Sequence, residues 1–147
     1  MNLVVDTNIV FSAILNSYSW IGQILLHSHK SLNFYSPGFL KKEIQNHKSK
    51  IKRITKLSDD EIDELINLLY SKIHFIDETL IPKETLQIAD ELTKPVDFDD
   101  AVFIGLAIHL NCKLWTGDKK LSNFLKINGF TNLISTNDLK EKFKRNN

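Results

Sequence analysis

Cysteine and long apolar runs are both scarce in this sequence of 147 residues. Cys112 is the only cysteine, so no intramolecular disulfide can form, and a reducing compartment fits the composition. The longest apolar run, residues 101–110, contains His109 and is far shorter than the roughly 18 residues that a membrane-spanning helix needs. The first residues lack the pattern of a signal peptide. We therefore expect a soluble, cytoplasmic protein without a membrane segment.

Net charge is also small, and it hides an uneven distribution of charged residues. The formal charge is +1, from 19 Lys and Arg against 18 Asp and Glu. Residues 41–56 hold seven basic residues and one acid, whereas residues 57–103 hold thirteen acids and three basic residues. Residues 113–147 are basic again, with eight basic residues and three acids. The protein as a whole therefore lacks the basic field typical of nucleic-acid binding, although its basic segments could contact phosphate.

Short apolar runs alternate with segments of helical periodicity along the chain. We predict strands at residues 3–5, 32–35, 72–76, 113–116 and 133–134. Strands that alternate with helices are typical of α/β folds with a mostly parallel sheet. The sequence shows no internal repeat and no linker. We expect one α/β domain over residues 1–147, with four to five short strands flanked by helices and a basic tail at about 140–147.

Local signals predict where some of the helices begin. Ser36-Pro37 reads as an N-cap followed by the first helical turn. Residues 40–54 then show one apolar stripe, which includes His47 and predicts a single helix. Glu43 lies beside this stripe and can face the edge of the sheet. Farther along the chain, residues 58–61 form a capping box that begins another helix.

Carboxylates stand where an α/β fold brings side chains together. Asp6 follows the first apolar run and Asp118 follows the fourth, so both are expected at the carboxyl edge of the sheet, where ligands bind in open α/β folds. Glu43 and Asp100 are expected to join them from helices. Acids in one cluster repel each other unless a cation neutralises them. Mg²⁺ and Mn²⁺ prefer oxygen ligands and assist phosphodiester hydrolysis, which is the reaction class that this set indicates.

Each acid also has a purely structural interpretation. Asp6 could cap the helix that follows it, and Asp97 and Asp100 both suit the first turn of a helix. Glu43 could be a solvent-exposed partner of Lys41 or Lys42, and Asp118 could be a turn residue after glycine. Only the joint occurrence of these acids at the expected positions favours a site.

Five segments together resemble a known family, the PIN domain, and within it bacterial VapC-type toxins and PilT N-terminus-like proteins. The resemblance covers almost the whole chain through their order and spacing. The segments are Val4-Val5-Asp6-Thr7-Asn8, the helical Glu43, Asp97-Phe98-Asp99-Asp100-Ala101, Phe103-Ile104-Gly105-Leu106-Ala107 and Trp115-Thr116-Gly117-Asp118-Lys119-Lys120-Leu121. One departure is that residues 45–60 form a longer, more basic stretch than the shortest members of the family have.

The resemblance implies a Rossmann-like sheet and a ribonuclease site that depends on Mg²⁺ or Mn²⁺. The four acids of the family's site match Asp6, Glu43, Asp100 and Asp118 in this chain. An auxiliary acid matches Asp97, and polar residues that hold ligands or water match Asn8 and Thr116. The resemblance also implies an RNA substrate, a cognate antitoxin protein that covers the acidic site, and a homodimer.

Basic and aromatic residues near the expected site could hold RNA. Lys41, Lys42 and Lys119 are candidates for phosphate contacts, as are Lys48, Lys50, Lys52, Arg53 and Lys56 if they face the acids. A solvated helix face is the alternative for these basic residues. Tyr18 and Trp20 could stack on unpaired bases, and Trp20 could equally be a core residue.

Three classes of function remain to be compared. The first is a metal-dependent endoribonuclease, acting either as the toxin of a type II toxin–antitoxin pair or as a housekeeping RNA-processing nuclease. The second is a non-catalytic PIN-like module that binds RNA or protein. The third, a haloacid-dehalogenase-type phosphatase, needs an aspartate two residues after its nucleophile, and Asn8 stands at that position.

Overall fold

A computed structural model of the chain describes residues 1–28, 31–96 and 101–146. The described residues contain a five-stranded parallel sheet in the order β3-β2-β1-β4-β5. Its strands are β1 (Asn2–Val5), β2 (Asn33–Pro37), β3 (Ile73–Ile76), β4 (Lys113–Trp115) and β5 (Leu133–Ile134). The predicted α/β fold and its strands are thus confirmed, and all of the pairings are parallel.

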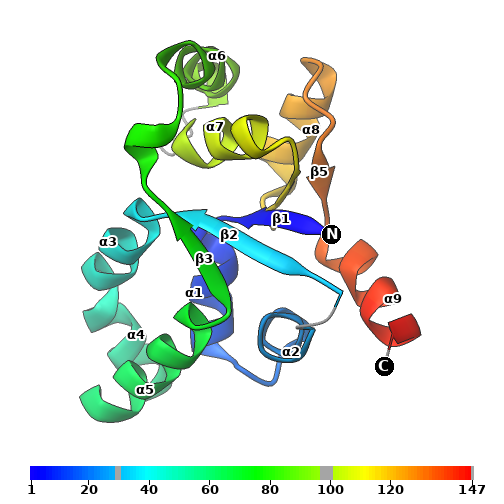
Figure 1. Cartoon of the computed structure of the whole chain (residues 1–147). Coiled ribbons are helices and arrows are strands. Elements are labelled where there is room, and N and C mark those ends of the chain that lie inside the picture. The colour runs from blue at the N-terminus through cyan, green and yellow to red at the C-terminus, as the bar shows by residue number, and fades with distance from the viewer. Residues whose placement is uncertain (29–30, 97–100, 147) are drawn as a thin grey trace.

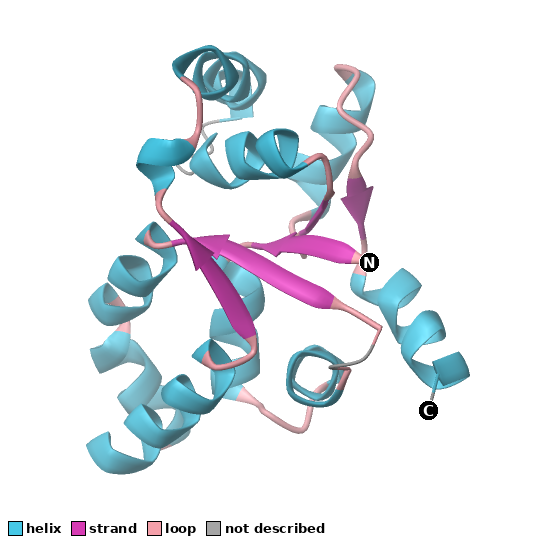
Figure 2. Cartoon of the chain, viewed as in Figure 1, coloured by secondary structure: helices cyan, strands magenta, loops and turns pink. Residues whose placement is uncertain are grey.

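Helices cover both faces of the sheet (Figures 1 and 2). One face carries α6 (Lys83–Thr93), α7 (Ala101–Leu110) and α8 (Lys119–Ile127). The other carries α1 (Thr7–Leu15), α2 (Trp20–His27), α3 (Phe39–Asn46), α4 (Lys48–Thr55), α5 (Asp59–Tyr70) and α9 (Thr136–Asn146). Two short 3₁₀ turns, Glu78–Leu80 and Lys94–Val96, flank α6.

The central strand is buried on both faces, as its apolar run predicts. Leu3, Val4 and Val5 have no exposed surface. Val4 is in register with Tyr35 of β2 on one side and with Leu114 of β4 on the other. This register places the residues that follow β1 and β4 beside each other at the carboxyl edge of the sheet.

The core is anchored by aromatic residues on the strands next to β1. The rings of Phe34 and Trp115 are both buried, and their centroids lie 5.9 Å apart. The indole N–H of Trp115 donates a hydrogen bond to Oγ1 of Thr136 at 3.0 Å, so the buried polar atom of this ring has a partner. That bond ties β4 to the start of α9.

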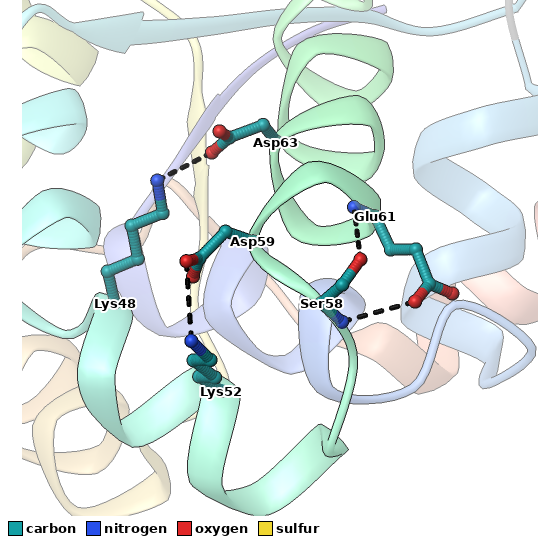
Figure 3. Close-up of polar contacts among 6 residues, drawn as sticks. All are labelled: Lys48, Lys52, Ser58, Asp59, Glu61 and Asp63. Atoms are coloured by element: carbon teal, nitrogen blue, oxygen red, sulfur yellow. Dashed lines mark hydrogen bonds and ion pairs between the residues drawn. The ribbon is translucent and has the colours of Figure 1, made fainter.

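The capping box at the start of α5 is confirmed (Figure 3). The backbone N–H of Glu61 donates to Oγ of Ser58, and the N–H of Ser58 donates to Oε1 of Glu61, both at 3.1 Å. The Ser19 hydroxyl caps α2 in a similar way, accepting from Gly22 N–H at 3.2 Å.

The prediction that Ser36-Pro37 opens a helix is wrong. Both residues belong to β2, and α3 begins at Phe39 with Gly38 as an N-cap that makes no side-chain bond. The Ser36 hydroxyl donates to the carbonyl of Val5 at 3.2 Å. Because that acceptor belongs to the neighbouring strand, the local sequence could not reveal it.

The prediction of a single helix over residues 40–54 is also wrong. The segment forms two helices, α3 and α4, that meet at His47, where the backbone has φ −101° and ψ 7°. Ile44 and Ile51 are both buried, whereas Ile54 is 48% exposed. The buried stripe therefore continues across the break as far as Ile51, and α4 packs against α1 and α5.

Within the described residues, no single helix has the length and apolar character that crossing a membrane requires. Only α1 and α2 taken together reach that length, and they are bent by 103° relative to each other.

Candidate active site

Asp6 lies between β1 and α1 and uses its two carboxylate oxygens differently. Oδ1 accepts a hydrogen bond from the backbone N–H of Ile9 at 2.9 Å, which makes Asp6 the N-cap of α1. Oδ2 is buried and has no hydrogen-bond partner among the described residues. The cap and the site were alternatives in the sequence, but in the structure one oxygen caps the helix and the other stays available.

The surroundings of Asp6 raise its pKa to about 6, from a usual value of 3.8. Burial is the largest cause, since the side chain is almost wholly removed from solvent, and the charges of Asp118 and Glu43 add to it. The nearby Thr116 hydroxyl, which forms no regular hydrogen bond to this carboxylate in the described residues, and the Ile9 N–H act in the opposite direction and lower the pKa. The carboxylates of Glu43 and Asp118 thus lie close enough to Asp6 to raise its pKa.

Glu43 faces inward from α3. The hydroxyl of Thr7, the first residue of α1, donates a hydrogen bond to Oε1 of Glu43. Both residues line a pocket of about 120 Å³ at the edge of the sheet. This acid pocket is lined by Asp6, Thr7, Asn8, Phe11, Glu43, His47 and Lys50. The alternative for Glu43, a solvent-exposed partner of Lys41 or Lys42, does not match this position.

Asp118 repeats the arrangement of Asp6 at the end of β4. Its Oδ1 accepts from the backbone N–H of Leu121 at 3.0 Å and caps α8. Its own backbone N–H donates to Oγ1 of Thr116 at 3.2 Å. Both acids therefore stand at the positive ends of helices, which favour negative charge. Unlike Asp6, Asp118 is exposed to solvent.

Two of the predicted acids, Asp97 and Asp100, lie outside the described residues. Over the ranges that the structure covers, no three His, Cys, Asp or Glu side chains form a group that could hold a metal ion. The donors that are described nevertheless fit a hard divalent cation. Asp6 offers a buried carboxylate oxygen without a hydrogen-bond partner among the described residues, and burial together with two further carboxylates raises its pKa. A cation would relieve both costs.

The three lysines predicted to contact RNA lie in different places. The Lys41 ammonium lies over the ring of Phe75, 4.2 Å from its centroid, and does not line the acid pocket. Lys42 lines a larger groove of about 620 Å³ together with Phe39, Glu78 and the start of α7. Lys119 lines a third pocket, beside Thr116 and the segment from β5 to α9.

The two aromatic candidates for base stacking do not line the acid pocket. Tyr18 is 88% exposed and precedes α2. Trp20 contacts α9 instead, with the Lys140 ammonium 4.9 Å from the centroid of its ring and the centroid of the Phe143 ring 6.1 Å away.

Sequence reasoning missed three residues of the acid pocket as site residues: Thr7, Phe11 and His47. Lys50 was predicted only as one of several basic residues that would contact phosphate if they faced the acids. A signal for His47 was present. Glu43, His47 and Lys50 follow each other at intervals of four and three, which is the spacing of one helical face. The break between α3 and α4 does not disrupt this alignment, because all three side chains line the same pocket.

Comparisons with known proteins agree with this architecture. A sequence search of curated proteins gives no match. Among solved structures, the chain is similar to VapBC2 from Rickettsia felis, whose crystal structure shows it bound to a DNA fragment from its promoter. The similarity has a TM-score of 0.67 at 16% identity and covers 92% of this chain and 98% of that one, which shows a shared fold. The family model of the PIN domain matches residues 4–135. Since that match covers most of the chain, including the acid pocket, the chain belongs to the PIN domain family.

Proposed function

We propose that this protein is a metal-dependent endoribonuclease that hydrolyses phosphodiester bonds in RNA. Members of the PIN domain family are generally nucleases, which supports the reaction class. The observation that carries the proposal is the buried Oδ2 of Asp6, which has no hydrogen-bond partner among the described residues. Burial raises the pKa of this carboxyl group, and the charges of Asp118 and Glu43 raise it further. Leaving such a group without a partner is costly, so its retention is best explained by a ligand.

The residues of the site would have distinct roles. Asp6, Glu43 and Asp118 would hold Mg²⁺ or Mn²⁺, together with Asp100 and the auxiliary Asp97. When bound, the ion would activate a water molecule and stabilise negative charge on the phosphodiester.

Backbone and hydroxyl groups of the chain fix the acids in place. The backbone N–H groups of Ile9 and Leu121 each donate a hydrogen bond to one carboxylate oxygen, and these bonds orient Asp6 and Asp118. Thr7 holds Glu43 toward the pocket. The polar groups of Asn8 and Thr116 would hold ligands or water beside them. Such prior positioning lowers the entropic cost of reaching the transition state.

We further propose that the nuclease is the toxin of a toxin–antitoxin pair, acting as a homodimer on cellular RNA. The structural similarity to VapBC2 of Rickettsia felis supports this proposal. We expect induced expression of the wild-type protein to arrest cell growth, and we expect cells that express the Asp6→Asn variant to grow normally. Growth unaffected by the wild-type protein would favour a housekeeping nuclease. Light scattering that shows only a monomer at micromolar concentration would contradict the dimer.

The activity itself is tested by incubating a mixed pool of single-stranded and structured RNA with purified protein. Reactions contain Mg²⁺, Mn²⁺ or EDTA, and wild type is compared with Asp6→Asn and Asp118→Asn. Circular dichroism verifies that the variants are folded. We expect cuts that require metal and disappear in both variants. Full activity in both variants would refute the site, and no cutting by wild type with either metal would favour a non-catalytic module.

A further inference from the structure

The acid pocket has a basic side that the proposed metal site does not use. Asp6 and Glu43 line it, and so do His47 and Lys50 from the α3–α4 segment. Phe11, one turn into α1, also lines the pocket and contacts both basic side chains. At about 120 Å³, the pocket is smaller than the roughly 300–1,000 Å³ of pockets that bury a small molecule. A phosphate group fits such a volume better than a nucleoside does.

The three lysines of α4, Lys48, Lys50 and Lys52, differ in the groups that they contact. Lys48 Nζ lies 2.6 Å from Oδ1 of Asp63, and Lys52 Nζ lies 3.3 Å from Oδ2 of Asp59 (Figure 3). Both of these lysines therefore face the acidic start of α5. Lys50 differs, because it forms no ion pair within residues 1–28, 31–96 and 101–146 and lines the acid pocket instead.

Phe11 holds the two basic side chains at the pocket. The Lys50 ammonium lies 5.5 Å from the centroid of the Phe11 ring, within the range of a cation–π contact. The imidazole of His47 meets the same ring edge-on, with centroids 5.8 Å apart and planes at 63°. One aromatic ring thus contacts both groups and restricts where they can lie.

A cluster of acids repels the phosphates of an approaching RNA strand. A nuclease that uses such a cluster therefore gains from a fixed cation beside it, because a phosphate contact positions the strand without reading its sequence. We propose that Lys50 and His47 form a phosphate subsite that binds the RNA backbone beside the acids, with Phe11 as its support. This subsite rests on the proposed function, since the strand that it holds is the one that the acids cleave.

Binding is measured apart from cleavage by fluorescence anisotropy of a labelled single-stranded RNA in EDTA, over a series of NaCl concentrations. The test variant is Lys50→Gln, and the matched control is Lys52→Gln, which removes the same charge from the same helix. We expect Lys50→Gln to raise Kd about fivefold and to reduce the slope of log Kd against log salt by about 0.7, as the loss of one phosphate contact predicts for single strands. Lys50→Arg should restore both values, and His47→Gln should raise Kd to a smaller extent.

Two results would overturn the subsite. One is equal Kd and salt slope for Lys50→Gln and Lys52→Gln, and the other is wild-type protein that does not bind the RNA at low salt. Thermal melting verifies that each variant is folded. With a cleavable RNA, Lys50→Gln should raise KM and leave kcat within about twofold of wild type, as expected for a contact made equally in substrate and transition state. A binding effect in a protein that cuts no RNA would retain the subsite and refute only the proposed nuclease.

Discussion

The hydroxyl of Thr7 donates a hydrogen bond to Oε1 of Glu43, joining the first turn of α1 to the middle of α3. Glu43 follows Lys41 and Lys42 on a largely exposed helix, so nothing in its local sequence keeps it out of solvent. The Thr7 bond holds it at the acid pocket. Thr7 is itself buried, and its position is fixed because it directly follows Asp6 at the end of the central strand.

Replacing Thr7 by Val removes this hydrogen bond while nearly preserving side-chain shape. We expect the rate of RNA cleavage to fall about tenfold, because a misplaced catalytic carboxylate loses its orientation. The free energy of unfolding should fall by about 1 kcal/mol, the usual net value of one hydrogen bond. Single-turnover kinetics and urea denaturation measure the two effects. Thr7→Ser keeps the donor and should retain most of the activity, whereas a wild-type rate in Thr7→Val would contradict a positioning role.

The raised pKa of Asp6 predicts how stability depends on pH when metal is absent. The pKa is about 6 in the folded protein and near 3.8 in the unfolded chain, so the folded state binds more protons between these values. The contribution of the Asp6 carboxyl to the free energy of unfolding is therefore fully present below pH 4 and is lost as the pH rises through 6.

An Asp6→Asn variant tests this dependence, since asparagine also caps helices and carries no charge. In EDTA at pH 8, it should be more stable than wild type by up to about 3 kcal/mol, given about 1.4 kcal/mol per pKa unit. The gain should vanish near pH 4. Urea denaturation across this pH range measures it, and a gain that is the same at both ends would show that charge is not its cause.

Divalent cations should stabilise the wild-type protein through the same carboxylate. A ligand that binds only the folded state at one hundred times its Kd adds about 2.7 kcal/mol to the free energy of unfolding. We expect Mn²⁺ to raise the melting temperature of wild type at neutral pH and to have little effect on Asp6→Asn. Asp63→Asn removes an exposed acid of α5 and serves as the control, because its response should match that of wild type. Equal responses in all three proteins would indicate non-specific binding.

Two glycines should differ sharply in their tolerance of alanine. A Cβ atom at Gly22 would lie 2.3 Å from the carbonyl oxygen of Ser17, which belongs to the backbone and cannot rotate away. We expect Gly22→Ala to lower the free energy of unfolding by about 2 kcal/mol or more, as overpacking does. At Gly117 no described atom lies within 4 Å of the added Cβ, so Gly117→Ala should unfold like wild type. Urea denaturation of both variants provides the comparison.

Local sequence signals accounted for most of the fold. The apolar run before Asp6 predicted a strand buried on both faces, and the Ser58–Glu61 capping box predicted the start of α5. Two predictions were wrong, the helix that begins at Ser36-Pro37 and the single helix over residues 40–54. Both errors arose where tertiary contacts determine the structure. Ser36 belongs to β2, where its hydroxyl donates a hydrogen bond to the Val5 carbonyl of the neighbouring strand. The predicted helix is divided at His47, and its second part, α4, packs on α1 and α5.

The site was predictable to the extent that the edge of the sheet defines it. Acids that follow β1 and β4 lie near each other because those strands are neighbours, and the charge of Asp118 does raise the pKa of Asp6. Thr7 was not predicted as a site residue, and Lys50 was only one of several basic candidates, since both positions depend on how α1 packs against α3 and α4. Which of several lysines faces the acids is likewise decided by the partners that α5 offers to Lys48 and Lys52.

The order of the strands in the sheet has a consequence for synthesis of the chain. β1 is the first strand to be synthesised, yet it lies at the centre of the sheet. Its pairing with β4, in which Leu3 is in register with Lys113, can form only after β4 has been synthesised. Contacts between such distant residues form slowly, because the loop between them must first be closed. Asp6 and Asp118 therefore cannot meet on the ribosome until β4 has left the exit tunnel, so a nascent chain cannot assemble the acid cluster before most of it has been translated.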